Sequence, residues 1–429
     1  MKPLRQFVRN PYFMIVIVLF LVHAFFMFYN LEKLATFGWD QVNNAWAAMR
    51  ILTVQKYPLL GMVAKGNSGM YIGPLYYYFV GIFYFFTQLH PIASPIIAGC
   101  TSLFSFWVIY YVTRRMFNAK VALVSCFIYT FSFFIIHAER IQWPVNFIAP
   151  LSLLIFYFLY KVLTGETKYA IHLAATIGLS FHIHFTSIFY PIIVLLAIPF
   201  ISLRKFSWKY ILLSVPAFLV FFIPQAIYYV QTKTAGNISN YSGYFQTYYH
   251  GFHLRRLIQI AHDAFIEFEA VLSTPYKILR NAVFFYLPFF FLTSYSKPLK
   301  NWYKLCYITA LWILVPWIIF ATYSGELTDY YFSSHLYIAI MIFGCLTVWI
   351  WERKQIAIRV CLCIFWIYYA ITNIQGFFHM PNGNLQQNIS IVQQTIQEGQ
   401  SINFTEGNPQ SYLFYYYLFI SHKPLPYQM

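Results

Sequence analysis

Asp40 combines a residue type and a position that could do chemistry. It ends the run Phe-Gly-Trp-Asp at 37–40 and is followed by apolar residues at positions 42, 45, 46 and 49. That spacing is typical of an amphipathic helix lying on a membrane surface. A carboxylate there could act as a general base toward a hydroxyl group. The alternative is that Asp40 caps this helix; the two roles are compatible, because a cap also holds the carboxylate in place.

Three basic side chains could hold a phosphate group. Arg140 lies beside a Trp-Pro pair at 143–144, and Arg255 and Arg256 follow one another in a long loop. Each has a second interpretation. Arg140 could be an interfacial anchor whose charged head reaches water, and Arg255 and Arg256 could face solvent or lipid headgroups.

His182 and His184 form a His-x-His pair where two short apolar runs meet. The pair is weak evidence for a metal site, and buried, hydrogen-bonded histidines are the favoured interpretation. The six cysteines all fall inside apolar runs. They are interpreted as small buried apolar residues and not as a disulfide framework or a metal site.

The composition shows which elements must position these residues. Of the 429 residues, 60% are hydrophobic, 22% aromatic and 9% charged. Too few charged side chains exist to cover a water-soluble surface, and the apolar content excludes a disordered chain. The sequence therefore predicts an all-α integral membrane protein.

Apolar runs predict about eleven membrane-spanning helices. They lie near residues 12–29, 92–113, 120–137, 147–163, 168–183, 184–203, 210–228, 282–296, 303–323, 335–351 and 356–373. A further run at 74–86 is short and rich in tyrosine and phenylalanine. Counting it as a span would reverse the positive-inside bias of every later loop, so it is placed in the outer interface.

This topology explains the net charge of +16. Nearly all of the basic excess falls in short inner loops, which predicts a cytoplasmic amino terminus and an extracytoplasmic carboxyl terminus in a multi-pass protein of the cell membrane. A nucleic-acid partner loses its support. We predict a polytopic domain at 1–373, with interfacial helices in an outer loop at 30–91, and a small outer cap at 374–429.

The order of the motifs resembles the bacterial branch of the protein-O-mannosyltransferase family (family 39) in the GT-C superfamily of membrane glycosyltransferases. That family has an acid-led helix, then Pro-Pro-Leu-Tyr-Tyr-Trp, then a span ending in Arg-Arg-x-Phe. This sequence has Asp40-Gln41, then Gly-Pro-Leu-Tyr-Tyr-Tyr at 73–78, and Arg-Arg-Met-Phe at 114–117. The resemblance covers residues 1–220 well, and the order and spacing of the short motifs carry its specificity.

The resemblance implies a GT-C-type bundle and a reaction. A sugar would pass, with inversion, from a polyprenyl-phosphate donor to a hydroxyl of a lipid, glycan or protein acceptor at the outer face, with Asp40 as the base. Cations would surround the leaving phosphate. The residues expected at this site, besides Asp40, are Lys65, Arg140, Arg255, Arg256 and His335 for the phosphate, and Gln41, Tyr76, Glu139, Asn146, His182 and His184 for the substrate cavity.

The sequence departs from the family at three points. Gln41 stands where members often have glutamate, Lys65 is the nearest cation before the Gly-Pro-Leu motif, and Asn146 or Glu139 stands where many members have a second aspartate. A divalent cation therefore stays an open alternative that no paired-acid motif supports, and no cofactor or metal ligand is assigned.

Other functions remain as alternatives. A transporter or permease would place ionisable residues in mid-membrane and show internal repeats, whereas the acidic residues here fall in loops or interfaces. A lipid-linked oligosaccharide ligase or polymerase, and an assembly factor that keeps the fold without activity, are the other two. The sugar and the acceptor are not specified by the sequence.

Overall fold

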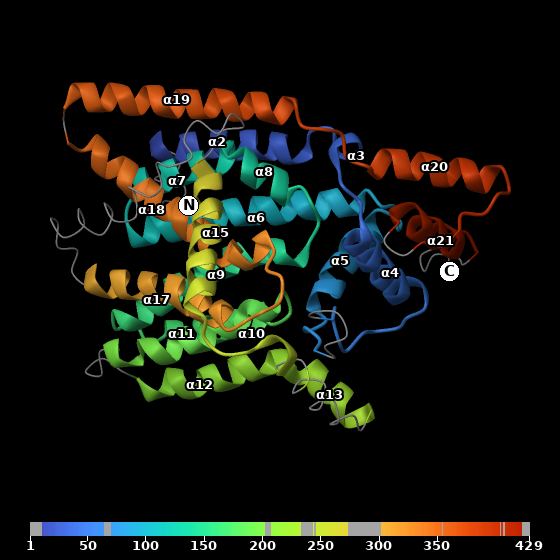
Figure 1. The fold of residues 1–429 in the computed structure, drawn as a ribbon, viewed down its shortest axis with the longest axis horizontal. Helices are drawn as coiled ribbons and strands as arrows, with labels where there is room; N and C mark the ends of the chain where they lie inside the picture. The colour runs from blue at the N-terminus through green and yellow to red at the C-terminus, as the bar shows by residue number, and fades with distance from the viewer. Residues whose placement is uncertain are drawn as a thin grey trace, which may run out of the picture.

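The protein is a helical bundle whose longest helices run roughly side by side (Figure 1). The computed structural model describes residues 11–63, 70–201, 207–232, 243, 246–272, 302–353, 355–403, 405 and 408–422. Within these ranges, β structure is limited to two isolated bridges, Val63 with Tyr71 and Tyr249 with Tyr323. The prediction of an all-α architecture is confirmed.

Among the described residues, 7 helical segments are long and apolar enough to cross a membrane. A helix of 18 residues, the shortest of them, reaches about 27 Å, which is close to the thickness of the hydrocarbon core. They are α2 (Pro11–Phe28), α6 (Ala93–Met116), η1 with α9 (Pro144–Phe147, Ile148–Leu163), α12 with η5 and α13 (Trp208–Leu219, Val220–Phe222, Ile223–Thr232), α17 (Trp302–Ala321), η7 with α18 (Asp329–Phe332, Ser333–Trp351) and α19 (Ile356–Phe378).

Three further predicted spans have a different form. Helices α7 (Ala119–Phe131) and α8 (Phe133–Glu139) are bent by 66°, and counting them as one span brings the number to 8. Helix α10 (Tyr169–Ser180) and the series η2, α11 and η3 (Phe185–Ile188, Phe189–Ala197, Ile198–Phe200) are shorter. The predicted span at 282–296 lies outside the described residues. The integral membrane class is confirmed, but the count of about eleven spans is not.

The aromatic run predicted at the outer interface forms α5 (Leu75–Phe86), with 12 residues. At 1.5 Å per residue it is about 18 Å long, too short to cross the hydrocarbon core. It is absent from the long apolar segments and lies beside α4 (Trp39–Thr53) at one end of the bundle (Figure 1). This agrees with its exclusion from the spans.

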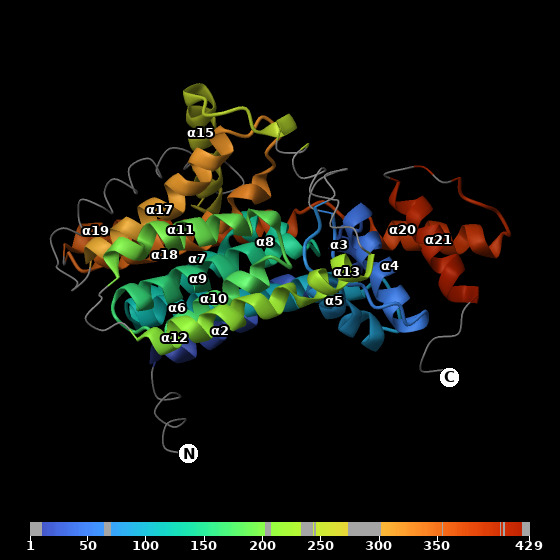
Figure 2. The ribbon, with the colours of Figure 1, turned by 90° about the horizontal axis from the view of Figure 1, so that it is seen from below.

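Helices α3 (Leu31–Leu34), α4, α5, α20 (Leu385–Gln397) and α21 (Pro409–His422) gather at that same end in both views (Figures 1 and 2). We call them the outer unit, after the side of the membrane that the sequence predicts for them. The backbone N–H of Phe37 donates to Oδ1 of Asn384 at 2.7 Å, and the hydroxyl of Tyr416 donates to the carbonyl of Leu89 at 2.6 Å. Buried side chains from α4, α5, α20 and α21 share one hydrophobic cluster. The predicted cap therefore packs directly on the outer loop.

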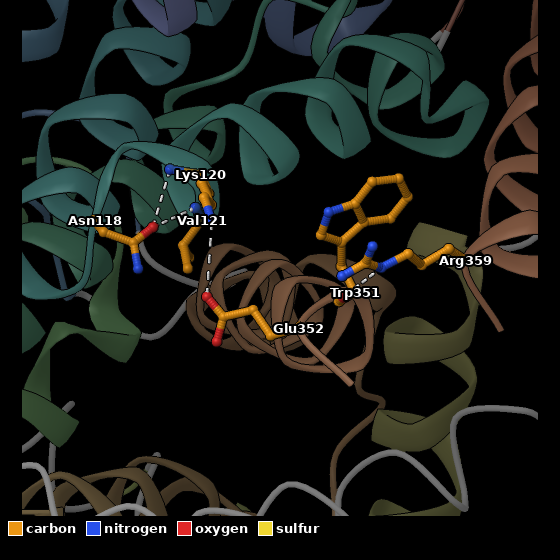
Figure 3. Close-up of polar contacts among 6 residues, drawn as sticks. All are labelled: Asn118, Lys120, Val121, Trp351, Glu352 and Arg359. Carbon is orange, nitrogen blue, oxygen red and sulfur yellow. Dashed lines mark hydrogen bonds and ion pairs between the residues drawn. The ribbon is translucent and has the colours of Figure 1, made fainter. Parts of the chain in front are cut away.

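The opposite end of the bundle holds basic and capping contacts (Figure 3). The side chain of Asn118 caps α7 by accepting from the backbone N–H groups of Lys120 and Val121, and Lys120 lies 3.9 Å from Glu352. Nε of Arg359 donates to the carbonyl of Trp351 at 2.9 Å. These contacts join the ends of α7, α18 and α19, away from the outer unit. Helix α15 (Leu254–Leu272) runs across the direction of the other helices in Figure 1 and lies at one face of the bundle in Figure 2.

Candidate functional site

Asp40 lies in the first turn of α4, but it does not cap the helix. The N-cap is Gly38, whose backbone N–H donates to Oε1 of Gln41 at 2.7 Å. Gln41 thereby supplies the half of a capping box that reaches back to the N-cap. The alternative role of Asp40 as the cap is therefore wrong, because Gly38 occupies that position. No described residue donates a hydrogen bond to the Asp40 carboxylate.

The surroundings of Asp40 favour a proton acceptor. The side chain is partly buried, and this burial raises its pKa. The amino-terminal end of a helix favours a negative charge and so limits that rise. Tyr77 lies within reach of the same charge: burial raises the pKa of Tyr77 to about 12, Arg50 lowers it and Asp40 raises it. A carboxylate that has a raised pKa and does not cap the helix is suited to general-base chemistry.

The predicted pattern of α4 is confirmed. Val42, Ala45 and Met49 are fully buried, while Trp46 is half-buried and Arg50 is exposed. The buried side chains join the cluster shared with α5 and α21, so the helix is held along its length. This packing fixes Asp40 relative to the motif in α5.

Gln142 joins the segments around Asp40 and was not singled out from the sequence. Its backbone carbonyl accepts from Nε2 of Gln41 at 2.8 Å, and its own Nε2 donates to the hydroxyl of Tyr76 at 2.5 Å. Its Oε1 accepts from the hydroxyl of Ser94 at 3.4 Å. Gln41, Tyr76 and Gln142 are all buried. The only sequence signal was a polar residue in a short outer loop.

We expect Gln142→Leu to destabilise the outer unit. The substitution keeps the backbone carbonyl bonded to Gln41 but leaves the buried hydroxyl of Tyr76 without this partner. A buried polar group that loses its partner costs about 1–3 kcal/mol. Thermal unfolding of the purified protein should show a lower midpoint, and Gln142→Glu, which keeps an acceptor for Ser94 and Tyr76, should lie closer to the native protein than Gln142→Leu. An unchanged midpoint in Gln142→Leu would contradict this role.

The turn before α5 is set by Gly73 and His182. The Gly73 N–H donates to the carbonyl of Phe181 at 3.1 Å, and the Leu75 N–H donates to Nδ1 of His182 at 3.3 Å. Nε2 of His182 lies 2.7 Å from the carbonyl of Phe221 and must carry the proton there, because a carbonyl only accepts. Both ring nitrogens are thus engaged in backbone contacts. His182 positions the Gly-Pro-Leu motif and has no nitrogen left for a metal.

His184 has a similar local role. Its Nδ1 accepts from the Thr186 N–H at 3.2 Å, so it caps η2, and its ring contacts Tyr330 and Tyr331. No group of three or more His, Cys, Asp or Glu side chains that could hold a metal occurs in the described part of the chain. The favoured interpretation of hydrogen-bonded histidines fits both residues.

Arg140 is held by the backbone of α2 and not by an open site. Its guanidinium donates to the carbonyls of Phe26, Met27 and Tyr29, and the residue is 5% exposed. Phe26 and Met27 are in the last turn of α2, whose carbonyls have no partner within the helix, and Tyr29 directly follows it. The NH1 and NH2 groups of Arg140 thus cap α2 and are buried, an arrangement that does not favour the predicted contact with a donor phosphate.

Glu139 and His335 are also buried away from the cavity beside α4. The Glu139 carboxylate accepts from the hydroxyls of Tyr129 and Tyr337 inside the bundle. His335 is 2% exposed, and its Nδ1 contacts the carbonyl of Phe332 at 3.1 Å. Both side chains are buried, which does not favour the predicted places of Glu139 in the substrate cavity and of His335 at the phosphate.

The remaining predicted residues are scattered. Arg256 donates to the carbonyl of Gly325 at 3.0 Å, and Arg255 is exposed; both begin α15, which lies away from the outer unit (Figure 2). Asn146 donates from Nδ2 to the carbonyl of Ile141 at 2.6 Å. Lys65 lies outside the described residues. Among the predicted residues that the structure describes, Asp40, Gln41 and Tyr76 are the ones that lie together.

A cavity of about 430 Å³ opens along α4, and the neighbours of Asp40 on that helix line it, although Asp40 itself does not. It is lined by residues of α4, by the loop at 56–60, by Tyr77 of α5 and by two tyrosines of α21. Trp39 and Asn43, which lie one residue before and three residues after Asp40, both line it. A pocket of this size is in the range that binds small molecules.

Comparison with known proteins identifies the fold of this chain. Residues 60–228 match the family model described as dolichyl-phosphate-mannose-protein mannosyltransferase. The structure of ArnT from Cupriavidus metallidurans bound to undecaprenyl phosphate superposes with a TM-score of 0.56 and 11% identity, over 94% of this chain and 75% of that chain. The chain has the GT-C fold.

Archaeal proteins share this GT-C fold as well. The apo oligosaccharyltransferase of Archaeoglobus fulgidus superposes with a TM-score of 0.59 and 13% identity, over 95% of this chain and 60% of that chain. AglB from the same organism, in complex with an inhibitory peptide and a dolichol-phosphate, superposes with a TM-score of 0.53 and 12% identity. The superposition covers 96% of this chain and 60% of that chain. The chain thus spans less than two thirds of these archaeal proteins. No curated protein sequence matches the chain.

The GT-C assignment confirms the resemblance inferred from the motifs. The matched segment at 60–228 contains the Gly-Pro-Leu motif, the Arg-Arg-Met-Phe motif and the loop with Gln142. Asp40 lies before it, on the helix that the same segment supports through Gln142 and Tyr76.

Proposed function

We propose that this protein transfers a sugar from a polyprenyl-phosphate donor to an acceptor hydroxyl at the outer face of the membrane, with Asp40 as general base. The observation that carries the proposal is the partly buried Asp40 carboxylate, which does not cap α4 and whose helix neighbours Trp39 and Asn43 line an open cavity. Two observations support the donor class. The chain has the GT-C fold, and two proteins with this fold were solved in complex with such lipids, ArnT with undecaprenyl phosphate and AglB with a dolichol-phosphate.

The reaction has three linked events. The Asp40 carboxylate takes the proton of the acceptor hydroxyl, and the acceptor oxygen forms a bond to the anomeric carbon of the sugar. The bond between that carbon and the phosphate oxygen breaks, and its electron pair leaves with the polyprenyl phosphate. Attack from the side opposite the phosphate inverts the anomeric configuration. Lys65 remains the proposed cation for the leaving phosphate, because it precedes the Gly-Pro-Leu motif.

The experiment for this function is transfer in membranes that contain the protein. They are supplied with a radiolabelled polyprenyl-phosphate sugar and a crude acceptor fraction from the source envelope. Label should appear in acceptor and polyprenyl phosphate should be released, with membranes lacking the protein as control. Donor that stays intact in the presence of the protein would contradict the proposal.

We expect the transfer rate to fall on the acid side. Asp40 accepts a proton only when ionised, and burial raises its pKa. The ionised fraction therefore decreases at a higher pH than for an exposed aspartate, and the rate should drop with one proton as pH falls through that raised pKa. The pH dependence of initial rate at saturating donor measures this. A flat rate down to the ordinary pKa of aspartate would exclude the assignment.

The orientation can be tested by cysteine labelling in intact cells. Phe86 at the end of α5 is 78% exposed and belongs to the outer unit, whereas Asn118 begins α7 at the opposite end, among basic residues. The positive-inside rule places Asn118 in the cytoplasm. A membrane-impermeant maleimide should label Phe86→Cys in a variant without other cysteines, and should label Asn118→Cys only after permeabilisation. The reverse pattern would overturn the orientation.

A further inference from the structure

The wall of the cavity along α4 is largely aromatic. Five of its lining side chains are aromatic: Trp39 and Trp46 of α4, Tyr77 of α5, and Tyr412 and Tyr415 of α21. The rings of Trp39 and Tyr412 lie with centroids 3.9 Å apart at the cavity wall. This contact joins α4 to α21, whose ribbons lie near each other in Figure 1. Apolar faces of sugar rings stack on such aromatic surfaces, while the polar edges of tyrosine and tryptophan remain able to hydrogen-bond.

The charge in this cavity is positive. Arg50 and Lys56 line it, and none of its described lining residues is acidic. Both are exposed, and neither takes part in an ion pair among the described residues. The Arg50 guanidinium lies 6.0 Å from the ring centroid of Trp46, so the cation and the aromatic surface are presented together. Two cations without an acidic partner attract an anionic ligand.

Arg50 lies further along α4 than Asp40. It follows Asp40 by ten residues, which is about 15 Å along a helix at 1.5 Å per residue. The leaving phosphate stays bound to the sugar carbon that the acceptor hydroxyl attacks, on the side opposite that hydroxyl. An anionic group bound by Arg50 is separated along the helix from this centre, which suits another part of the acceptor.

The size of the cavity agrees with this geometry. A volume of about 430 Å³ is enough for a small number of sugar rings. Asn43 lies between Asp40 and Arg50 on the same helix and lines the cavity, so its amide can hydrogen-bond to ring hydroxyls. The wall thus offers stacking, amide hydrogen bonding and positive charge in order along α4.

We propose that this cavity is an acceptor subsite for an anionic saccharide, with a carboxylate or phosphate on a ring separate from the ring that is glycosylated. Arg50 and Lys56 bind the anionic group, and the aromatic side chains hold the sugar rings. The proposal rests on the proposed function, because Asp40 marks where the reacting hydroxyl lies.

The test measures saccharide binding to the full-length protein in lipid nanodiscs by calorimetry. The probes are a hyaluronan tetrasaccharide, which is carboxylated, with neutral chitotetraose as its control, and mannose 6-phosphate, with mannose as its control. The variants are Arg50→Gln and Lys56→Gln, and the control is Lys33→Gln, an exposed lysine of α3 that does not line the cavity.

At least one anionic probe should bind about tenfold more tightly than its neutral control, and added salt should weaken that binding. Arg50→Gln and Lys56→Gln should each remove most of this preference, while Lys33→Gln keeps it. Which anionic probe binds identifies the charged group. Equal binding of anionic and neutral probes, no binding of any probe, or an unchanged preference in Arg50→Gln would overturn the proposal, as would competitive displacement of the saccharide by undecaprenyl phosphate.

Asp40→Asn separates this inference from the proposed function. It should keep the saccharide binding while losing transfer. Native-level transfer in Asp40→Asn with normal binding would remove the base assignment and leave a saccharide site. Loss of transfer in Asp40→Asn without any anionic preference in the native protein would remove only the subsite.

Discussion

Asp40→Asn is expected to lower the rate of sugar transfer by about 100- to 10,000-fold, the range in which general bases contribute to catalysis. The amide has nearly the shape of the carboxylate but cannot take the proton of the acceptor hydroxyl. Because Gly38 and not Asp40 is the N-cap of α4, the substitution leaves the cap of the helix in place. Initial rates at saturating donor and acceptor give the comparison.

A folding defect can be told apart from a catalytic one. Burial raises the pKa of Asp40, so the folded state binds this proton more tightly than the unfolded state. The free energy of unfolding therefore decreases as pH rises through the pKa of Asp40 in the folded protein. Asparagine does not ionise, so Asp40→Asn does not show this decrease. The unfolding midpoint of Asp40→Asn at neutral pH should equal or exceed that of the native protein. Glu32→Gln, an exposed acid of α3, is the matched control and should keep native transfer; a comparable loss there would remove the special role of Asp40.

Gly73→Ala is expected to reduce transfer by about 100-fold and to destabilise the protein by about 1–3 kcal/mol. A Cβ at Gly73 would lie 1.9 Å from Nδ1 and 2.1 Å from Cε1 of His182. His182 cannot easily move away, because its ring bonds to the backbone at Leu75 and Phe221. The turn before α5 must therefore shift, and with it Tyr76 and Tyr77 beside Asp40. Thermal unfolding and the transfer rate measure the two effects.

Gly81→Ala is the matched control for Gly73→Ala. Gly81 is a buried residue within α5, and a Cβ there would meet no atom within 4 Å. Alanine in place of glycine inside a helix stabilises by about 0.5–1 kcal/mol. We expect native or slightly higher stability and native transfer. If Gly73→Ala behaved like Gly81→Ala, the close approach of His182 to this turn would not matter for the site.

The helix that carries Asp40 could be predicted because its signals are local. The apolar residues at 42, 45 and 49 repeat at helical spacing, and the structure buries all three. The short length and aromatic content of 74–86 placed it outside the spans, and α5 has 12 residues. Both predictions depend on residues within one turn or a few turns of each other.

The partners around Asp40 could not be predicted because they depend on contacts between distant segments. Gln142 is 101 residues from Gln41 and 66 from Tyr76 along the chain, yet it bonds to both. Arg140 was placed at a phosphate from its type and neighbours, whereas the carbonyls of α2 that bind it lie more than a hundred residues away. Gly38 was also not recognised as the cap, because its donor group is a backbone N–H and no side chain marks it.

Some predicted spans form helices that are shorter than their apolar runs suggested, and this is one reason why the predicted number of spans is not confirmed. Helix α10 and the series with α11 are apolar but shorter than the other spans. In the sequence, their apolar runs merged with the turn that contains His182 and His184, so each run seemed longer than the helix it forms. Hydropathy alone does not mark such a turn, because only two polar side chains interrupt the apolar residues there.

The pH dependence of transfer by the native protein and Asp40→Asn, measured side by side with a radiolabelled polyprenyl-phosphate sugar, tests the central claim most directly. We predict that the native rate falls on the acid side with one proton, and that Asp40→Asn shows a small residual rate without this acid limb. Native-level transfer by Asp40→Asn, or the same acid limb in both proteins, would contradict the assignment of Asp40 as the base.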